Sequence, residues 1–274
     1  MTITPVYVLS VIGAEERRAA FAEQARSARS AWRFVDAATA LPEWLSYSEA
    51  RAVRRFGRAL TRGELGCFAS HCGAWKALLA SSDKQCLVLE DDIIGDWGII
   101  DRLLEIDIAA FGLALVRLYA THPFQHRLAI SRFLGPHCHL VEARGMFLGA
   151  QGYLLTRHAA ARLVRLATTV EMPVDWLMGR YWDYGFPNYC VFPFPIIERS
   201  VPSNIGDRST PVPRPPRVDA IVRFGWRVAD RLSRGYADNV RFRQNPFGFT
   251  SDAGPSFADR HQARARPDAS RTPG

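Results

Sequence analysis

Three consecutive acids, Glu90, Asp91 and Asp92, follow an apolar run that has the composition of a buried strand. Adjacent carboxylates repel one another, so a strand that ends in this way predicts a compensating cation. Mg²⁺ and Mn²⁺ prefer oxygen ligands and bind one or two carboxylates together with phosphate oxygens of a substrate. If the strand pattern continues, Glu90 and Asp92 point to the same side and form the metal pair. The alternative is an acidic turn or a helix N-terminus, where acids also gather.

A second segment with chemical potential lies upstream, where residues 63–71 read G-E-L-G-C-F-A-S-H. Thr61 precedes it with Glu64 three residues on, which is the spacing of a capping box, so we expect a helix from Thr61 through Leu79. That helix carries Ser70 and His71 just before the acidic strand. Glu64 either contacts a ligand or only closes the capping box, and a histidine in a helix is otherwise most often a packed core residue.

Alternating strand and helix patterns supply the framework that must position these residues. The chain begins with a β-branched run typical of a buried strand, and helical and apolar segments then alternate, with a hairpin expected around Gly135-Pro136. This alternation predicts an α/β domain with a mostly parallel sheet over residues 1–206. Open sheets of this class bind ligands beyond the carboxyl ends of their strands. The expected strands are 3–12, 32–35, 85–90, 114–119 and 150–156, and the expected helices 15–30, 61–79, 101–108 and 157–167.

Residues 207–274 differ in composition from the rest of the chain. The segment 207–217 has four prolines in eleven residues, which predicts an extended linker, and the last twenty residues are polar and expected to be disordered. Of the chain's formal charge of +8, this region holds +6, from 13 arginines and 7 aspartates. A nucleic-acid-binding function, which the basic composition would suggest, therefore has little support in the main body of the chain.

Between the linker and the tail, residues 218–234 predict a basic amphipathic helix. This helix allows two interpretations. It lies on an anionic membrane surface with Phe224 and Trp226 near the headgroups, or it packs its apolar side on the preceding domain and exposes a basic face. The apolar positions are Ile221, Val222, Gly225, Val228, Ala229 and Leu232, and the arginines are Arg223, Arg227, Arg231 and Arg234.

The cysteines and the apolar runs indicate the cellular compartment of the protein. Five cysteines form an odd set without a C-x-x-C pair, so we expect reduced thiols rather than a disulfide scaffold or a zinc ribbon. No uncharged apolar run approaches the roughly 20 residues of a membrane span, and the N-terminus lacks the pattern of a secretory signal. We therefore expect a cytoplasmic protein, either free or peripheral at the inner face of the plasma membrane.

Together these segments resemble glycosyltransferase family 25, which comprises bacterial glycosyltransferases of lipooligosaccharide synthesis and collagen galactosyltransferases. Order and spacing match over roughly residues 3–206. The combination of a G-E-x-G-C-x-x-S-H helix with L-E-D-D is the specific part of the resemblance. The matching segments are Val6 to Leu9 followed by Arg17 and Arg18, Gly63 to His71, Leu89 to Asp92, Gly149 to Leu155, and Pro173 with Asp175.

The resemblance implies a GT-A-type nucleotide-sugar-binding domain and an inverting glycosyltransferase. The implied donor is a UDP-sugar, with UDP-galactose favoured, and the implied acceptor is lipopolysaccharide, lipooligosaccharide, a lipid-linked oligosaccharide or another cell-surface glycan. Mn²⁺ or Mg²⁺ held by Glu90 and Asp92 would bridge the two phosphates of the departing UDP as a Lewis acid. Inversion needs a base that deprotonates the attacking hydroxyl. Asp175 is the first candidate, with the N-cap of a helix at Trp176 as its alternative role, and Asp183 is a weaker candidate.

The resemblance also implies a set of residues that contact the donor, namely Leu9, Arg17, Glu64, Ser70, His71 and Asp91. The chain departs from the family at Leu9-Ser10, where Asn-Leu is common, and at Asn204, where the family has aspartate. Two alternative functions use the same residues. One is a nucleotide-sugar-binding protein of the same fold without transfer activity, and the other is a metal-dependent phosphohydrolase that cleaves a UDP-sugar without an acceptor.

Overall fold

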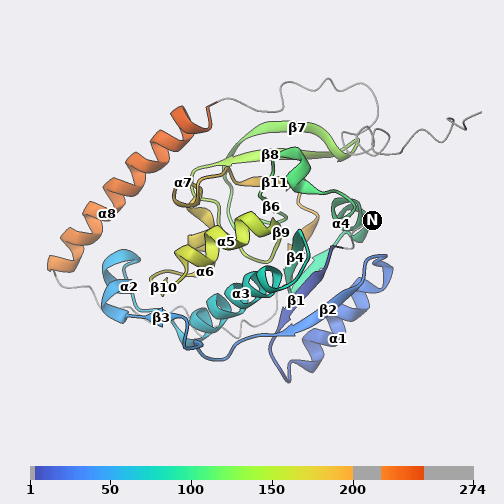
Figure 1. Cartoon of the computed structure of the whole chain (residues 1–274), viewed down its shortest axis with the longest axis horizontal. Coiled ribbons are helices and arrows are strands. Elements are labelled where there is room, and N and C mark those ends of the chain that lie inside the picture. Colours follow the sequence, from blue (N-terminus) through green and yellow to red (C-terminus); the bar gives the residue numbers. More distant parts are fainter. Residues whose placement is uncertain (1–3, 200–216, 244–274) are drawn as a thin grey trace, which may run out of the picture.

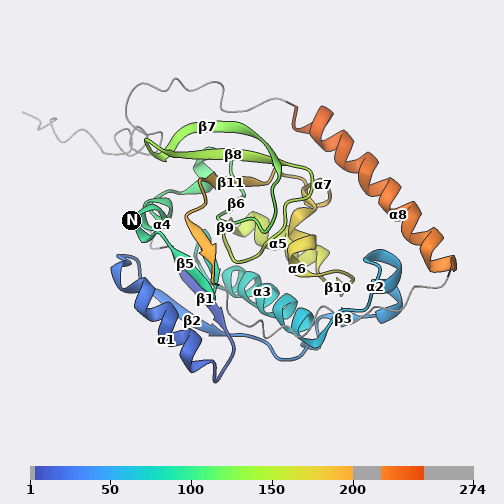
Figure 2. The same ribbon diagram turned by 180° about the vertical axis from the view of Figure 1, so that it is seen from behind.

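The computed structural model describes residues 4–199 and 217–243. A sheet of eight strands, in the order β2-β1-β4-β9-β6-β11-β8-β7, forms its centre, and helices pack on both faces (Figure 1). Two small sheets, β10-β3 and β12-β5, lie beside it, as the opposite view shows (Figure 2). The α/β class expected from the sequence is confirmed.

The elements have the following bounds. The strands of the large sheet are β1 (Val6–Ser10), β2 (Trp32–Asp36), β4 (Gln85–Glu90), β6 (Leu115–Arg117), β7 (Gln125–Gly135), β8 (Cys138–Arg144), β9 (Gly152–Thr156) and β11 (Tyr189–Phe192), and the small sheets hold β3 (Ser46–Tyr47), β5 (Ile93–Gly95), β10 (Thr169–Val170) and β12 (Ile196–Glu198). The helices are α1 (Glu15–Gln24), α2 (Glu49–Arg55), α3 (Arg62–Ala80), α4 (Trp97–Leu104), α5 (Arg157–Leu166), α6 (Val174–Gly179), α7 (Tyr181–Tyr184) and α8 (Arg217–Tyr236).

The central strands are apolar throughout because both faces of the sheet are covered. In β1, Tyr7 and Leu9 face the core that contains α3, α5 and α6. Val6 and Val8 face the opposite core, which contains α1 and α4. A strand buried on both sides loses the alternation of polar and apolar residues that marks a solvent-facing strand. The continuous apolar runs in the sequence therefore correspond to strands of the double-sided core.

The large sheet is mixed, which corrects the expectation of a mostly parallel one. β1 pairs in parallel with β2 and β4, and β6 pairs in parallel with β11. However, β9 lies antiparallel between β4 and β6, and the β7-β8 hairpin continues the sheet antiparallel to β11. The turn between Gly135 and Cys138 is too short for a crossover, so it forces the antiparallel direction there. The direction of β9 depends on long connections that composition does not encode.

Helix α3 begins where the capping box predicts. The hydroxyl of Thr61 accepts a hydrogen bond from the Glu64 backbone N–H at 3.2 Å, and the Glu64 carboxylate accepts one from the Thr61 N–H at 2.9 Å. At the other end of the helix, the Arg157 guanidinium donates to the carbonyls of Leu78 and Leu79 at 2.6 and 2.9 Å. Both ends of α3 are thus held, which fixes the helix that carries Ser70 and His71.

The amphipathic helix expected over residues 218–234 is present as α8. It lies across α2 and α7 at one side of the molecule (Figure 1). The interpretation in which its apolar side packs on the preceding domain is wrong, because Phe224 and Leu232 are exposed whereas Asp230 binds arginines of that domain. The amphipathic pattern defines two faces, but the ion pairs decide which one turns inward.

The proline-rich linker expected over residues 207–217 lies, up to residue 216, outside the described residues, as do Asn204 and the tail beyond residue 243. Within the described ranges, no helix combines the length and apolar composition needed to cross a bilayer.

Replacing Thr61 by alanine removes the side-chain acceptor of the α3 capping box. We expect Thr61→Ala to lower the free energy of unfolding by about 1 kcal/mol, as is usual for the loss of an N-cap. Urea denaturation followed by circular dichroism measures the change. The matched control is Thr168→Ala, at an exposed residue that caps no helix. Equal stability of the two variants would contradict a stabilising role for the cap.

Candidate active site

A cavity of about 550 Å³ opens at the carboxyl ends of three neighbouring parallel strands, β1, β2 and β4. Its walls are the end of β1, the loop 37–39 after β2, the first turns of α3 and the acidic turn after β4. The volume is within the usual range for small-molecule sites, and the position agrees with the general rule for open α/β sheets. The predicted residues that line it are Leu9, Arg17, Ser70, His71, Glu90, Asp91 and Asp92.

Asp91 is the best compensated of the three acids. One of its carboxylate oxygens accepts a hydrogen bond from the Ser10 hydroxyl at 2.7 Å, and the other is paired with Arg17. Arg18 donates from Nε to the same Ser10 hydroxyl at 3.1 Å. Asp91 is buried, so these partners replace the water that its charge would otherwise require. Ser10, at the position where the chain departs from the family pattern, therefore anchors the acidic turn.

Asp92 lacks such compensation. Its Oδ2 lies 3.1 Å from Arg17 Nη2, but its Oδ1 is buried without a hydrogen-bond partner among the described residues. Burial, reinforced by the negative charge of Glu90, raises the pKa of Asp92 to about 7 despite the opposing charge of Arg17. A cation next to both carboxylates would remove this penalty, because an opposite charge favours the ionised form. The donor set and the unpartnered oxygen therefore fit a divalent metal ion.

His71 is completely buried and joins the acidic turn to the core. Its Nδ1 lies 2.8 Å from the hydroxyl of Tyr153, and its Nε2 lies 3.3 Å from Oε1 of Glu90. The Tyr153 hydroxyl also accepts a hydrogen bond from Trp75 Nε1 at 2.8 Å. Since the indole N–H can only donate, the hydroxyl proton is available to His71 Nδ1, which leaves the Nε2 proton to donate to Glu90. The chain Trp75–Tyr153–His71 thus orients Glu90 toward the cavity.

Cys67 lines the cavity, and no role was expected for it from the sequence. Its sulfur, a ring nitrogen of His71 and a carboxylate oxygen of Glu90 all lie within 4.8 Å of one another, a spacing compatible with one metal ion. Cys67 and His71 are four residues apart and therefore share one face of α3, which is the signal that could have found the cluster. The site thus contains two possible ligand sets, which share Glu90.

Ser70 shapes the wall of the cavity. Its hydroxyl accepts a hydrogen bond from the Ala38 N–H at 2.8 Å and donates one to the Gly66 carbonyl at 2.7 Å. A Cβ at Gly66 would lie only 2.5 Å from the Ala38 carbonyl oxygen. Glycine is therefore required for the loop after β2 to approach α3 this closely.

Glu64 does not line the cavity. Its carboxylate forms a two-pronged pair with Arg58, at 2.7 and 2.6 Å, in addition to the capping box with Thr61. Glu64 therefore closes the capping box, which is one of the two roles expected for it from the sequence. The role of Glu64 in donor binding stays a prediction.

Asp175 also lies away from the cavity lining. It occupies the first turn of α6, where its Oδ1 accepts a hydrogen bond from the N–H of Trp176 at 2.9 Å. The helix begins at Val174 with Pro173 as its N-cap, so Asp175 does not have the capping role considered for it. Its assignment as the base stays a prediction.

Strand β12 and the residue after it lie against one side of the acidic turn. No sequence motif indicated this neighbour. The N–H of Arg199 donates to the carbonyl of Asp92 at 2.7 Å, and the negative charge of Glu198 contributes to the raised pKa of Asp92. The hydroxyl of Tyr119 donates to Glu198 at 3.3 Å. These residues follow Asp92 in the sequence by up to about a hundred positions, so only the fold brings them to the site.

We expect Tyr153→Phe to destabilise the protein by about 2 kcal/mol, because it leaves the buried Trp75 N–H and His71 Nδ1 without their shared partner. Urea denaturation monitored by tryptophan fluorescence measures the loss. The control is Tyr7→Phe, since Tyr7 is equally buried but its hydroxyl has no hydrogen bond among the described residues. A Tyr153→Phe protein as stable as the control would show that the three-residue chain does not hold the site.

Comparison with known proteins supports the resemblance. A segment of 66 residues, 23% of this chain and 11% of its relative, is 39% identical to inactive glycosyltransferase 25 family member 3 from Homo sapiens. A segment of 36 residues, 13% of this chain and 6% of the relative, is 50% identical to procollagen galactosyltransferase 2 from Mus musculus. The chain thus matches only about a tenth or less of the length of these relatives.

Among solved structures, the glycosyltransferase GlyE from Streptococcus pneumoniae TIGR4 aligns with a TM-score of 0.37 and 12% identity, over 91% of this chain and 66% of that chain. Residues 3–178, well over half of the chain, match the family described as glycosyltransferase family 25 (LPS biosynthesis protein). The matched range contains the first strand, the helix of Ser70 and His71, the acidic turn and Asp175. The chain therefore belongs to glycosyltransferase family 25.

Proposed function

We propose that this protein is a metal-dependent, inverting glycosyltransferase with a GT-A-type donor domain. It would transfer a hexose, with galactose favoured, from a UDP-sugar to a lipopolysaccharide, lipooligosaccharide or other cell-surface glycan. The observation that carries the proposal is the acidic turn at the rim of the cavity, in which Asp92 keeps a buried, unpartnered oxygen. Family membership supports the reaction class, and the galactosyl donor is suggested by the name of one relative, procollagen galactosyltransferase 2.

Glu90 and Asp92, which both line the cavity, would hold Mn²⁺ or Mg²⁺. When bound, the cation neutralises charge that develops on the departing diphosphate. Arg17 lines the same cavity and carries a positive charge beside both Asp91 and Asp92. We assign Arg17 to the diphosphate, because a guanidinium offers several donors in a planar arrangement that suits phosphate oxygens.

The transfer step would join the acceptor oxygen to the anomeric carbon while the bond from that carbon to the UDP oxygen breaks. The acceptor attacks from the face opposite UDP, so the configuration inverts, and Asp175 would take the proton of the attacking hydroxyl. Asp175 is half-buried at the start of α6. Its neighbour Trp176 is partly exposed and packs edge-on against Phe56 at a ring distance of 5.0 Å. An exposed aromatic ring beside the base would suit stacking on an acceptor sugar.

A non-catalytic role is the second candidate, because one matched relative is named an inactive member of the family. That role would retain donor binding and lack sugar transfer. A phosphohydrolase would instead release sugar phosphate or free sugar without needing an acceptor. Assays of UDP release and of sugar transfer to an acceptor separate these functions from the proposed transfer.

Replacing Asp92 by asparagine keeps its size but removes the negative charge next to the proposed metal. With Mn²⁺ and a panel of UDP-sugars, we expect the wild type to release UDP from one sugar and to lose this activity in EDTA. We expect Asp92→Asn to reduce UDP release at least about a hundredfold, since metal stabilisation of the leaving group is worth several kcal/mol.

The matched control is Asp107→Asn, which removes the same charge from an exposed helix cap where asparagine also serves. EDTA-resistant UDP release, or equal activity of Asp92→Asn and the control, would contradict metal dependence through Asp92. Calorimetric binding of UDP without release from any UDP-sugar would favour the non-catalytic alternative.

Replacing Asp175 by asparagine tests the proposed base. With purified rough lipopolysaccharide as acceptor, we expect the rate of sugar transfer to fall by about 10²- to 10⁴-fold, the usual contribution of a general base. The affinity for UDP, measured by calorimetry with Mn²⁺, should stay unchanged because Asp175 does not line the donor cavity. Asp183→Asn serves as the comparison. A larger loss of transfer in that variant would assign the base to Asp183.

A further inference from the structure

Helix α8 turns its polar side toward the rest of the protein. At its middle, the two carboxylate oxygens of Asp230 pair with the guanidinium of Arg180, both at 2.7 Å, and with that of Arg55 at 3.1 and 3.2 Å. The two arginines hold the pKa of Asp230 below its usual value, although burial opposes them. Because charged pairs with two-pronged geometry are the strong ones, Asp230 fixes the rotation of the helix about its axis.

The first half of α8 is attached in the same orientation. Asp219 accepts a hydrogen bond from Arg54 Nε at 2.8 Å. Arg223 reaches the carbonyl of Gly57 at 3.5 Å, and the guanidinium of Arg55 lies 4.3 Å from the centre of the Trp226 ring. These contacts come from α2 and from Gly57, two residues after its end, so one side of α8 is joined to this segment over about two helical turns.

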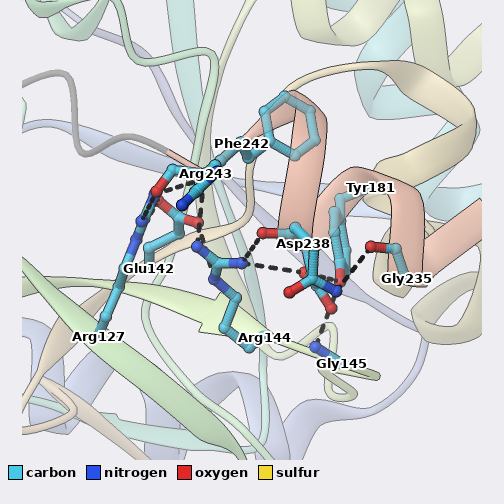
Figure 3. Close-up of polar contacts among 10 residues, drawn as sticks. Arg127, Glu142, Arg144, Gly145, Tyr181, Gly235, Asp238, Phe242 and Arg243 are labelled. Atoms are coloured by element: carbon cyan, nitrogen blue, oxygen red, sulfur yellow. Dashed lines mark hydrogen bonds and ion pairs between the residues drawn. The ribbon is translucent and has the colours of Figure 1, made fainter.

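The end of α8 and the turn after it are held by a third set of contacts, drawn in Figure 3. The hydroxyl of Tyr181 donates to the carboxylate of Asp238 at 2.5 Å, and the guanidinium of Arg144 donates to the backbone carbonyls of Asp238 and Phe242. Arg127 donates to the Phe242 carbonyl at 2.6 Å. The helix is therefore tied at its start, middle and end, and its outer face cannot turn inward without breaking all three attachments.

That outer face is apolar. Ile221, Phe224 and Leu232 are 72%, 68% and 69% exposed. They lie at i, i+3 and i+11, which places them on one side of the helix, opposite the side that contains Asp219 and Asp230. Val228 and Tyr236 extend the same exposed face. Contiguous apolar patches of this kind usually mark an interaction surface.

The charges beside this face are all positive. Arg227 and Arg231 are exposed at its border, whereas both acids of α8, Asp219 and Asp230, are engaged on the inner side. An apolar face bordered by arginine matches an anionic lipid surface, where side chains such as Phe224 enter the headgroup region and arginines meet phosphates. A second copy of the chain would bring the same arginines against this face. Its α8 would offer no outward acid to pair with them, because Asp219 and Asp230 are on the inner side.

We propose that α8 docks this protein on an anionic membrane surface, with Ile221, Phe224 and Leu232 inserted between headgroups and Arg227 and Arg231 at lipid phosphates. This surface goes beyond the proposed transfer reaction and does not depend on it. The residues after α2 lead directly to Thr61 and Arg62 at the cavity rim. Docking would therefore place the cavity rim and α6 near the membrane, where a lipid-linked acceptor would be found.

Co-sedimentation of the full chain with vesicles tests the proposal. One set of vesicles contains only phosphatidylcholine, and the other also contains about a quarter phosphatidylglycerol, so that only the second is anionic. We expect the wild type to bind the anionic vesicles and to be released as salt is raised, because salt screens the arginine–phosphate attraction. Phe224→Glu should weaken this binding at least tenfold.

The control is Leu128→Glu, which introduces the same glutamate at another exposed apolar residue, on β7 and away from α8. It should bind vesicles as the wild type does, and unchanged thermal unfolding of both variants shows that they are folded. Absence of binding by the wild type, equal binding of both vesicle types, or undiminished binding by Phe224→Glu would overturn the proposal.

Light scattering tests whether a second copy of the chain, rather than a membrane, covers the apolar face of α8. A wild-type dimer that Phe224→Glu dissociates, without vesicle binding by either protein, would overturn membrane docking in favour of self-association. UDP release from a soluble UDP-sugar should be the same for Phe224→Glu and the wild type. If UDP release is equal and vesicles are not bound, membrane docking is wrong and the proposed function stands. If the wild type releases no UDP, the proposed function is contradicted independently of membrane docking.

Discussion

Repulsion among the carboxylates at the end of β4 is the constraint on which the arrangement of the site depends. Asp91 is stabilised by Ser10 and Arg17, which brings the end of β1 and the start of α1 against the acidic turn. Glu90 is oriented by His71, which the core holds through Tyr153. Asp92 is left with a buried oxygen that has no partner among the described residues, and its pKa is raised to about 7. The fold thus compensates Asp91 most fully and leaves Asp92 with a buried oxygen, which is the feature on which the proposed metal site rests.

The double-sided core explains how this unfavourable charge is tolerated. Strands β1, β4 and β9 are packed on both faces, so the acidic turn follows a segment that cannot shift to relieve the repulsion. Helix α3 adds His71 and Cys67 from one side of the sheet, and its ends are held by the capping box and by Arg157. The close approach of the loop after β2 to Gly66 completes the cavity wall. Rigid packing and site chemistry are therefore parts of one arrangement.

Helix α8 shows the opposite use of charge. Its two acids pair with arginines of α2 and with Arg180, and Arg144 of β8 holds the turn that follows it. These contacts leave the apolar side of α8 exposed. In most surface helices the apolar side packs inward because burial of apolar area is the larger gain. Here the polar contacts are dense and two-pronged, so they determine the orientation. The apolar face stays outward because turning it inward would break these ion pairs, and this outward face is the basis of the proposed membrane docking.

The sequence by itself determined the α/β class, the helix of Ser70 and His71, the acidic strand end and the family. Each rests on local spacing, such as the capping box at Thr61 and Glu64 or the apolar run before Glu90. Only the tertiary structure decided the antiparallel direction of β9, the contributions of Tyr153 and Glu198, and the outward apolar face of α8. These features depend on contacts between residues far apart in the chain. Local patterns define which faces and side chains exist, but long-range packing and ion pairing decide what each one meets.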